Sequence, residues 1–193
     1  EVAPLRDVFA SLFFVGIGML LERSTLVELG PKVLVAALGI GFKDLTPLLG
    51  DAGAFADSIE QLIAPFRESK VDCICGIEAR GFIFGAAAAT GLGCGFVPMR
   101  KPGKLPAATI SVDYALEYGS DRLEMHVDAI RPGARVLLID DVLATGGTLS
   151  AAAALLDRAG AEIVGAGLLI ELLALQGRSR WQRNAPLHAV IAI

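Results

Sequence analysis

The sequence is poor in aromatic, cysteine and histidine residues, and these shortages disfavour several classes of protein. Aromatic residues make up 6% of the 193 residues, and the chain has one Trp, three Cys and two His. Three cysteines cannot all pair, and Cys73 and Cys75 stand two apart in an apolar run, as small core residues of a strand do. A disulfide framework and a zinc site are therefore disfavoured, and we expect a cytoplasmic protein.

Positive charge and long membrane-type segments are also scarce. The formal net charge is −4 and the pI is about 5.2, which argues against a general nucleic-acid-binding protein. The apolar run at residues 8–21 could be taken for a membrane anchor, but it has 14 residues. A spanning helix needs about 20 residues. We therefore expect a buried helix at this position and no membrane association.

Apolar residues and glycine are abundant, at 54% of the chain and 22 residues respectively. This suits one domain with a sizeable core. From residue 71 onwards, short apolar runs alternate with helical stretches, which predicts βαβ units and an α/β fold with a mainly parallel twisted sheet flanked by helices. We predict strands over residues 71–77, 94–99, 122–127, 135–139, 162–170 and 187–193, and helices over residues 82–92 and 149–159.

Residues 100–121 interrupt this alternation with two prolines and two glycines. We predict a single long loop over this range. Loops of this length in a compact domain are usually functional or disordered. The basic residues Arg100, Lys101 and Lys104 cluster at its start.

The most informative segment is VLLIDDVLATGGT, residues 136–148. A hydrophobic strand leads to two aspartates, a short turn follows, and a helix begins. Glycines in such a turn let backbone N–H groups approach an anion, and the helix start adds unpaired donors and a positive dipole end. The segment predicts a cradle for a phosphate monoester, formed by Ala144, Thr145, Gly146, Gly147 and Thr148.

Asp140 and Asp141 have a different predicted task beside this cradle. They can accept hydrogen bonds from the two hydroxyls of a ribose, or approach a Mg²⁺ ion bound to the ligand. Neighbouring carboxylates repel each other, so either partner would ease their coexistence. The alternative is a strand-to-helix turn without a ligand, which would be favoured for an isolated Gly-Gly pair but is much weaker for the whole constellation.

Residues 136–148 resemble the motif of type I phosphoribosyltransferases that binds phosphoribosyl pyrophosphate (PRPP). Four other segments are similar, in the same order, to adenine phosphoribosyltransferases: FKDLTPLL (42–49), GIEARGFIFG (76–85), GFVPMRKPGKLP (95–106) and LEYGSDRLEMHVDAI (116–130). The resemblance covers residue 39 to the C-terminus. It implies a Rossmann-like single domain over residues 1–193, with a small N-terminal hood at 1–45, a PRPP-binding core at 71–193 and a flexible catalytic loop.

The resemblance also implies an activity. Adenine and PRPP would give AMP and pyrophosphate, with Mg²⁺ as the cofactor and a homodimer as the assembly. Arg80, Lys101 and Lys104 are expected to contact pyrophosphate, with Arg100 beside them. For any one of these residues the alternative is a solvated basic loop.

The candidate lid over the site is the predicted loop at residues 100–121. Within it, Glu117 and Tyr118 match the catalytic loop of the family, and Glu117 is expected to transfer a proton at the purine. The base is expected near Gly41, Phe42 and Lys43.

The base-binding segment departs from the family pattern. Lys43 stands where the family commonly has arginine, and Ala36 and Leu38 stand where it has prolines. Residues 1–38 do not resemble the usual hood. A type I enzyme for xanthine, hypoxanthine-guanine or orotate therefore stays open as an alternative. A regulator that senses PRPP is a third reading, but it predicts a basic DNA-binding module that this acidic sequence does not show.

Overall fold

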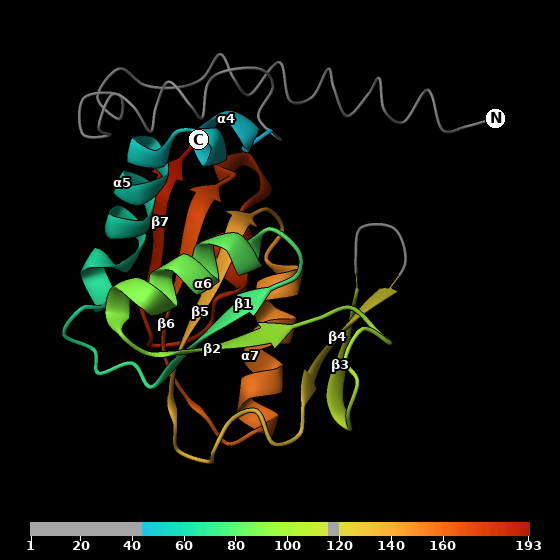
Figure 1. Cartoon of the computed structure of the whole chain (residues 1–193). Helices are drawn as coiled ribbons and strands as arrows, with labels where there is room; N and C mark the ends of the chain where they lie inside the picture. The colour runs from blue at the N-terminus through green and yellow to red at the C-terminus, as the bar shows by residue number, and fades with distance from the viewer. Residues whose placement is uncertain (1–43, 116–119) are drawn as a thin grey trace. The chain divides into compact units, whose positions relative to one another are not determined.

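A five-stranded parallel sheet forms the centre of the protein in the computed structural model, which describes residues 44–115 and 120–193 (Figure 1). All four pairs of neighbouring strands are parallel, as the sequence predicted. The strand order is β2-β1-β5-β6-β7. The strands are β1 (Cys73–Ile77), β2 (Gly95–Met99), β5 (Arg135–Leu143), β6 (Glu162–Glu171) and β7 (Leu187–Ala192).

The chain divides into two compact units, and residues 59–192 form the larger of them. Residues 44–58 belong to the other unit and contain α4 (Thr46–Gly50) and most of α5 (Ala52–Ile63). Asp44 and Asp51 accept hydrogen bonds from the N–H groups of Thr46 and Ala54, both at 2.8 Å. Side-chain acceptors of this kind satisfy the first donors of a helix, which explains where the two helices begin.

Two helices cover opposite faces of the sheet (Figure 1). Helix α6 (Gly81–Leu92) connects β1 to β2 and packs on β1 and β5, while α7 (Gly147–Arg158) connects β5 to β6. The predicted helices are therefore confirmed, with each beginning one or two residues earlier. Along the strand order, the crossover from β1 leads outward to β2, and the crossover from β5 leads in the opposite direction to β6. The direction of winding thus changes between β1 and β5.

The prediction of one loop over residues 100–121 was wrong. Residues Thr109–Ala115 form β3, which pairs antiparallel with β4 (Ser120–His126). Ile110, Val112 and Tyr114 alternate with polar residues and pack against the hydrophobic core, which is the period-two pattern of a half-buried strand. The Pro and Gly residues that precede β3 hid this pattern. Residues 116–119, which include Glu117 and Tyr118, lie outside the described residues.

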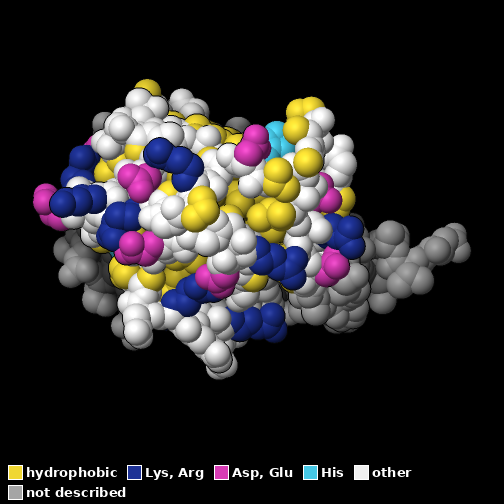
Figure 2. Space-filling view, turned by 90° about the horizontal axis from the view of Figure 1, so that it is seen from below, with side chains coloured by type: hydrophobic (Ala, Val, Ile, Leu, Met, Phe, Trp, Pro, Cys, Tyr) yellow, Lys and Arg dark blue, Asp and Glu magenta, His cyan; other side chains and the backbone are white. Residues whose placement is uncertain are grey.

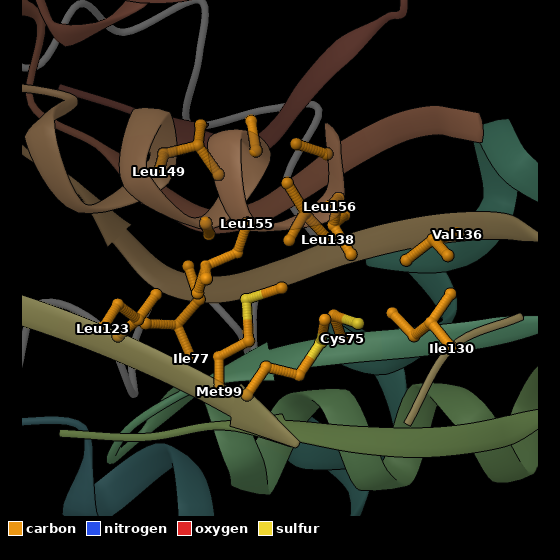
Figure 3. Close-up of a cluster of buried hydrophobic side chains, with 14 of the residues drawn as sticks. Cys75, Ile77, Met99, Leu123, Ile130, Val136, Leu138, Leu149, Leu155 and Leu156 are labelled. Atoms are coloured by element: carbon orange, nitrogen blue, oxygen red, sulfur yellow. The ribbon is translucent and has the colours of Figure 1, made fainter. Parts of the chain in front are cut away.

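The main hydrophobic core lies between the sheet, α7 and the β3–β4 hairpin (Figure 3). Leu149, Leu155 and Leu156 of α7 point toward Leu138 of β5 and Ile77 of β1. The core also contains Cys75, which is fully buried, so its predicted role as a small core residue is confirmed.

Charged residues on the surface are largely paired with residues of opposite charge. Ion pairs join Arg183 to Asp157 and Arg122 to Asp113, and Figure 2 shows basic and acidic side chains interspersed over one face of the molecule. Within the described residues, no helix is both long enough and apolar enough to span a bilayer.

Close packing of α6 on the sheet depends on two glycines and one aromatic ring. A Cβ atom at Gly76 of β1 would lie 2.6 Å from the Phe96 ring, and one at Gly85 of α6 would lie 2.8 Å from it. The Phe96 ring of β2 therefore fills the space that these glycines leave. The Phe82 ring packs edge-on against it, with centroids 5.9 Å apart.

We expect Gly76→Ala to lower the free energy of unfolding by about 1–3 kcal/mol, because an added methyl group must displace Phe96 from a packed core. Urea denaturation would measure the change. Gly95→Ala in β2 is the control, since its Cβ would make ordinary contacts with the nearest atom 3.7 Å away. Equal stability of the Gly76→Ala variant and the unchanged protein would show that Phe96 does not occupy this space.

Candidate functional site

The predicted site residues that the structure describes lie at or after the ends of three neighbouring strands of the sheet. β1, β2 and β5 end at Ile77, Met99 and Leu143, and the strand order places β1 between the other two. Because parallel strands point the same way, their carboxyl ends meet at one edge. The change of winding direction between β1 and β5 is the place where open α/β sheets bind ligands.

The two aspartates lie within β5 and not after it. The predicted strand ended at Ile139, but β5 continues to Leu143, with Asp140 paired in register with Leu168. The Oδ2 atom of Asp141 lies 2.6 Å from Nη2 of Arg80, which follows β1. This ion pair joins β1 to β5 at the change of winding and brings together two predicted site residues.

Asp140 occupies a confined position beside the same strand ends. Its Oδ1 atom accepts a hydrogen bond of 2.9 Å from the N–H group of Asp141. A Cβ atom at Gly81 would lie 2.8 Å from this oxygen, so the glycine at the start of α6 leaves room for the carboxylate. Burial and the neighbouring Asp141 carboxylate raise the pKa of Asp140 well above its ordinary value. Asp141 Oδ2 is itself buried, and its charged partner is the Arg80 guanidinium. A cation or hydroxyl donors at this pair would ease the coexistence of the two carboxylates.

The turn after β5 has the backbone geometry that an anion cradle requires. Gly146 adopts a left-handed conformation with φ of 80°, and α7 begins at Gly147. The N–H group of Ser150 donates to the carbonyl oxygen of Gly146 at 3.0 Å, as in a regular helical turn. The N–H groups of residues 147–149 precede this bond and have no partner within the helix. Phosphate binding at residues 144–148 stays a prediction.

Glu78 contacts the basic segment after β2, which includes Lys101 and Lys104, two of the residues predicted to contact pyrophosphate. Its carboxylate accepts hydrogen bonds from Nζ of Lys104 at 2.6 Å, from the N–H group of Lys101 at 2.9 Å and from two nitrogens of Arg100 at 3.3 Å. The Glu78 side chain is 8% exposed. Burial alone would raise its pKa, but these hydrogen bonds outweigh burial and lower the pKa to about 2.

Sequence reasoning missed Glu78, although its position gave a signal. It is the first residue after a buried strand, where polar side chains of an α/β protein collect. Its partners show that Arg100 and Lys104 are neighbours at this edge. They also show that β1 and β2 are joined by charge, as β1 and β5 are.

The Lys101 side chain takes another direction. Its Nζ atom donates to the hydroxyl group of Tyr114 at 2.6 Å and to the carboxylate of Asp121. Burial alone would lower the pKa of Lys101, but these two partners raise it. The structure therefore separates this ammonium group from Glu78 and ties the segment after β2 to the hairpin.

The remaining predicted site residues fall in two other segments of the sequence. Gly41, Phe42 and Lys43, expected at the base, lie outside the described residues, as do Glu117 and Tyr118. Among residues 44–115 and 120–193, no group of three or more His, Cys, Asp or Glu residues could hold a metal ion.

Comparison with known proteins gives a consistent result. Residues 49–185 match the phosphoribosyl transferase domain. An adenine phosphoribosyltransferase from Xanthomonas campestris pv. campestris (strain B100) is 58% identical over 154 residues, which cover 80% of this chain and 83% of the relative. A relative of the same name from Clostridium perfringens is 52% identical over 142 residues, or 74% of this chain and 83% of the relative.

Solved structures agree in fold as well as in sequence. Adenine phosphoribosyltransferase from Rhodothermus marinus superposes with a TM-score of 0.77 and 52% identity, covering 80% of this chain and 88% of that one. The enzyme from Saccharomyces cerevisiae, in complex with adenine and an imino-altritol bisphosphate, gives a TM-score of 0.72 and 41% identity over 79% of this chain and 88% of that one. The chain therefore belongs to the phosphoribosyltransferase family and, within it, to the adenine phosphoribosyltransferases.

Proposed function

We propose that this chain transfers the 5-phosphoribosyl group of PRPP to adenine, which forms AMP and releases pyrophosphate. The observation that carries the proposal is the arrangement of strand ends. β5 ends with two aspartates and a glycine turn, and next to them lies the segment after β1 that contains Glu78 and Arg80. The basic segment after β2 lies on the other side of the β1 segment. One edge therefore offers groups for every charged part of PRPP.

Each part of PRPP has a proposed partner. The N–H and hydroxyl groups of residues 144–148 bind the 5-phosphate, and Asp140 and Asp141 accept hydrogen bonds from the ribose hydroxyls. Arg80, Arg100 and Lys104 stabilise the pyrophosphate as the bond to the anomeric carbon breaks, and Lys101 would join them after leaving Asp121. Preorganised charge of this kind favours the transition state because the protein has already oriented it.

Lys104 and Arg100 already have an anionic partner in Glu78. Pyrophosphate must therefore exchange with this carboxylate to reach them. The exchange would make tight binding of pyrophosphate depend on the rest of the substrate, because the 5-phosphate and ribose contacts supply further binding free energy.

The base and the proton transfer are assigned to residues outside the described part of the chain. We propose that adenine binds near Gly41, Phe42 and Lys43, and that Glu117 and Tyr118 act at the purine. The support is the sequence resemblance, together with the adenine bound in the Saccharomyces cerevisiae relative.

Magnesium fits the aspartate pair as a cofactor. Two neighbouring carboxylates, one of them paired with Arg80, supply the oxygen ligands that Mg²⁺ prefers. With two carboxylates at hand, we propose that the ion is held by PRPP and by Asp140 or Asp141 together. When bound, it would neutralise negative charge on the pyrophosphate and ribose oxygens.

A homodimer and a cytoplasmic location are further proposals, and the family resemblance is their support. Sedimentation equilibrium would test the assembly. Localisation of a tagged chain in its own cells would test the compartment.

Turnover with a panel of bases tests the proposed function. We expect PRPP-dependent nucleotide formation with adenine, and much lower kcat/KM with hypoxanthine, guanine, xanthine and orotate. The measurement is release of pyrophosphate in the presence of Mg²⁺, with a reaction lacking base as the control. Turnover of another base without adenine would assign a different enzyme, and PRPP binding without turnover of any base would favour the regulator.

The Asp140→Asn and Asp141→Asn double variant tests the ribose and magnesium assignment. Each ribose hydrogen bond to a charged acceptor (~1.5–3 kcal/mol) would become one to a neutral acceptor (~0.5–1.5 kcal/mol), and the two differences together should weaken PRPP binding about 10- to 100-fold. Titration calorimetry in Mg²⁺ would measure the Kd. Asp157→Asn, on the exposed side of α7, should leave the Kd unchanged. An unaltered Kd in the double variant would remove this assignment.

The Glu78→Gln variant tests the charge cluster through stability. Because the folded pKa of Glu78 is lowered to about 2, its stabilisation is present above the ordinary Glu pKa and is lost as the pH falls toward 2. At pH 7 the variant should be less stable by about 1–2 kcal/mol. This is less than the lowered pKa alone would give, because solvent screens the partly exposed Arg100 and Lys104.

Urea denaturation at neutral and acidic pH would measure both effects. The unchanged protein should lose stability between about pH 4.5 and pH 2, and Glu78→Gln should lose less over this interval. Glu60→Gln is the matched control, since Glu60 pairs with Arg67 at the surface and is 61% exposed. Identical pH dependence in the Glu78→Gln variant and the unchanged protein would contradict the cluster.

A further inference from the structure

The segment that follows β6 lies directly beside the turn that follows β5. Leu143 and Glu171 are partners in register at the ends of these two strands, and the N–H group of Leu172 donates to the carbonyl oxygen of Leu143 at 2.9 Å. The chain then forms two short 3₁₀ helices, η2 (Leu173–Leu175) and η3 (Gly177–Arg180). Two turns far apart in sequence therefore leave the sheet side by side.

The two turns touch through their backbones at a pair of buried glycines. A Cβ atom at Gly177 would lie 2.1 Å from the carbonyl oxygen of Ala144 and 3.0 Å from the nitrogen of Gly146. A Cβ atom at Gly146 would lie 2.5 Å from the carbonyl oxygen of Gly177. The obstructing atoms are backbone atoms, so a side chain at Gly177 cannot be accommodated by a rotamer change. It must displace the turn at residues 144–147.

The position of Gly177 is itself fixed by the sheet. The guanidinium group of the next residue, Arg178, donates from Nε to both carboxylate oxygens of Glu171 at 3.0 and 3.1 Å. It also donates to the carbonyl oxygen of Leu187 in β7 at 2.7 Å. The Glu171 side chain is 4% exposed, and a buried charge of this kind needs its partner. Hydrogen bonds from Arg178 therefore connect η3 to β6 and to β7.

We propose that Gly177 is a positioning residue for the turn at residues 144–148. Its backbone supports Ala144 and Gly146, and the Arg178–Glu171 pair holds that support in place. The orientation of the N–H groups in the turn is thereby set before a ligand arrives. This inference rests on the proposed function, in which residues 144–148 bind the 5-phosphate.

The proposal predicts an effect that depends on the ligand. The 5-phosphate is present in PRPP and in AMP, and it is absent from adenine and from pyrophosphate. A displaced turn should therefore weaken binding of the first two compounds and not of the last two. A general loss of structure would not make this distinction.

The Gly177→Ala variant tests the proposal in both directions of the reaction. We expect the KM values for PRPP and for AMP to rise about tenfold, and the values for adenine and pyrophosphate, each measured with the cosubstrate saturating, to change less than about twofold. Ribose 5-phosphate, used as a competitive inhibitor, should show the same tenfold loss. Thermal denaturation would report stability in parallel.

Gly167→Ala in β6 is the matched control. Its Cβ would meet the ends of the Ile139 and Leu62 side chains at 2.9 and 3.0 Å, far from the turn in the register of β6. This variant should lose thermal stability while all four KM values stay within about twofold. Should Gly177→Ala fail to fold, Arg178→Gln carries the test, with the same ligand pattern and a rise of about threefold or more.

Two results would overturn the inference. One is an equal rise of all four KM values, and the other is unchanged KM for both PRPP and AMP. Thr148→Val separates this failure from that of the proposed function. If Thr148→Val raises the KM for PRPP and AMP and Gly177→Ala does not, the positioning role alone is wrong. If neither variant alters these values, residues 144–148 do not bind the 5-phosphate and both assignments fall.

Discussion

Parallel pairing of β1 with both β2 and β5 is the constraint on which the rest of the molecule depends. It brings three strand ends together at one edge, and the change of winding between β1 and β5 leaves that edge uncovered by a crossover. The Arg80–Asp141 and Arg100–Glu78 ion pairs then connect neighbouring strand ends. The close contact of the Phe96 ring with Gly76 determines how closely α6 packs on the sheet beside these strand ends. Chemistry at this edge is a consequence of sheet topology.

The charges at this edge are compensated before any ligand binds. Arg80 pairs with Asp141, Lys104 and Arg100 pair with Glu78, and Lys101 pairs with Asp121. An acidic chain can thus maintain a basic cluster without a strongly positive surface. A ligand must replace these carboxylates as the partners of the basic groups, so a simple anion gains little binding free energy. A molecule that carries two anionic groups and a diol at the right spacing gains contacts at each.

The parallel sheet and the glycine turn between β5 and α7 could be predicted from the sequence because each is encoded locally. Buried parallel strands appear as continuous apolar runs, and the Asp-Asp and Gly-Gly pairs lie within one short segment. The hairpin was missed because prolines and glycines obscured a short alternating strand. The extension of β5 through Asp140 and Asp141 was missed because two carboxylates rarely sit inside a strand. In the structure, Gly81 leaves room for the Asp140 carboxylate, and Arg80 pairs with that of Asp141.

Contacts between distant segments are the part that sequence patterns do not encode. Glu78 looks like an ordinary polar residue at a strand end until its partners after β2 are known. Gly177 looks like an ordinary turn residue, yet its importance lies in an atom that it lacks, because the carbonyl of Ala144 occupies the place of a Cβ. A list of the side chains in residues 144–148 would not include it. The precision of the proposed anion site, which is made of backbone amides, depends on the backbone beside it, and the adjacent strand end supplies that backbone contact.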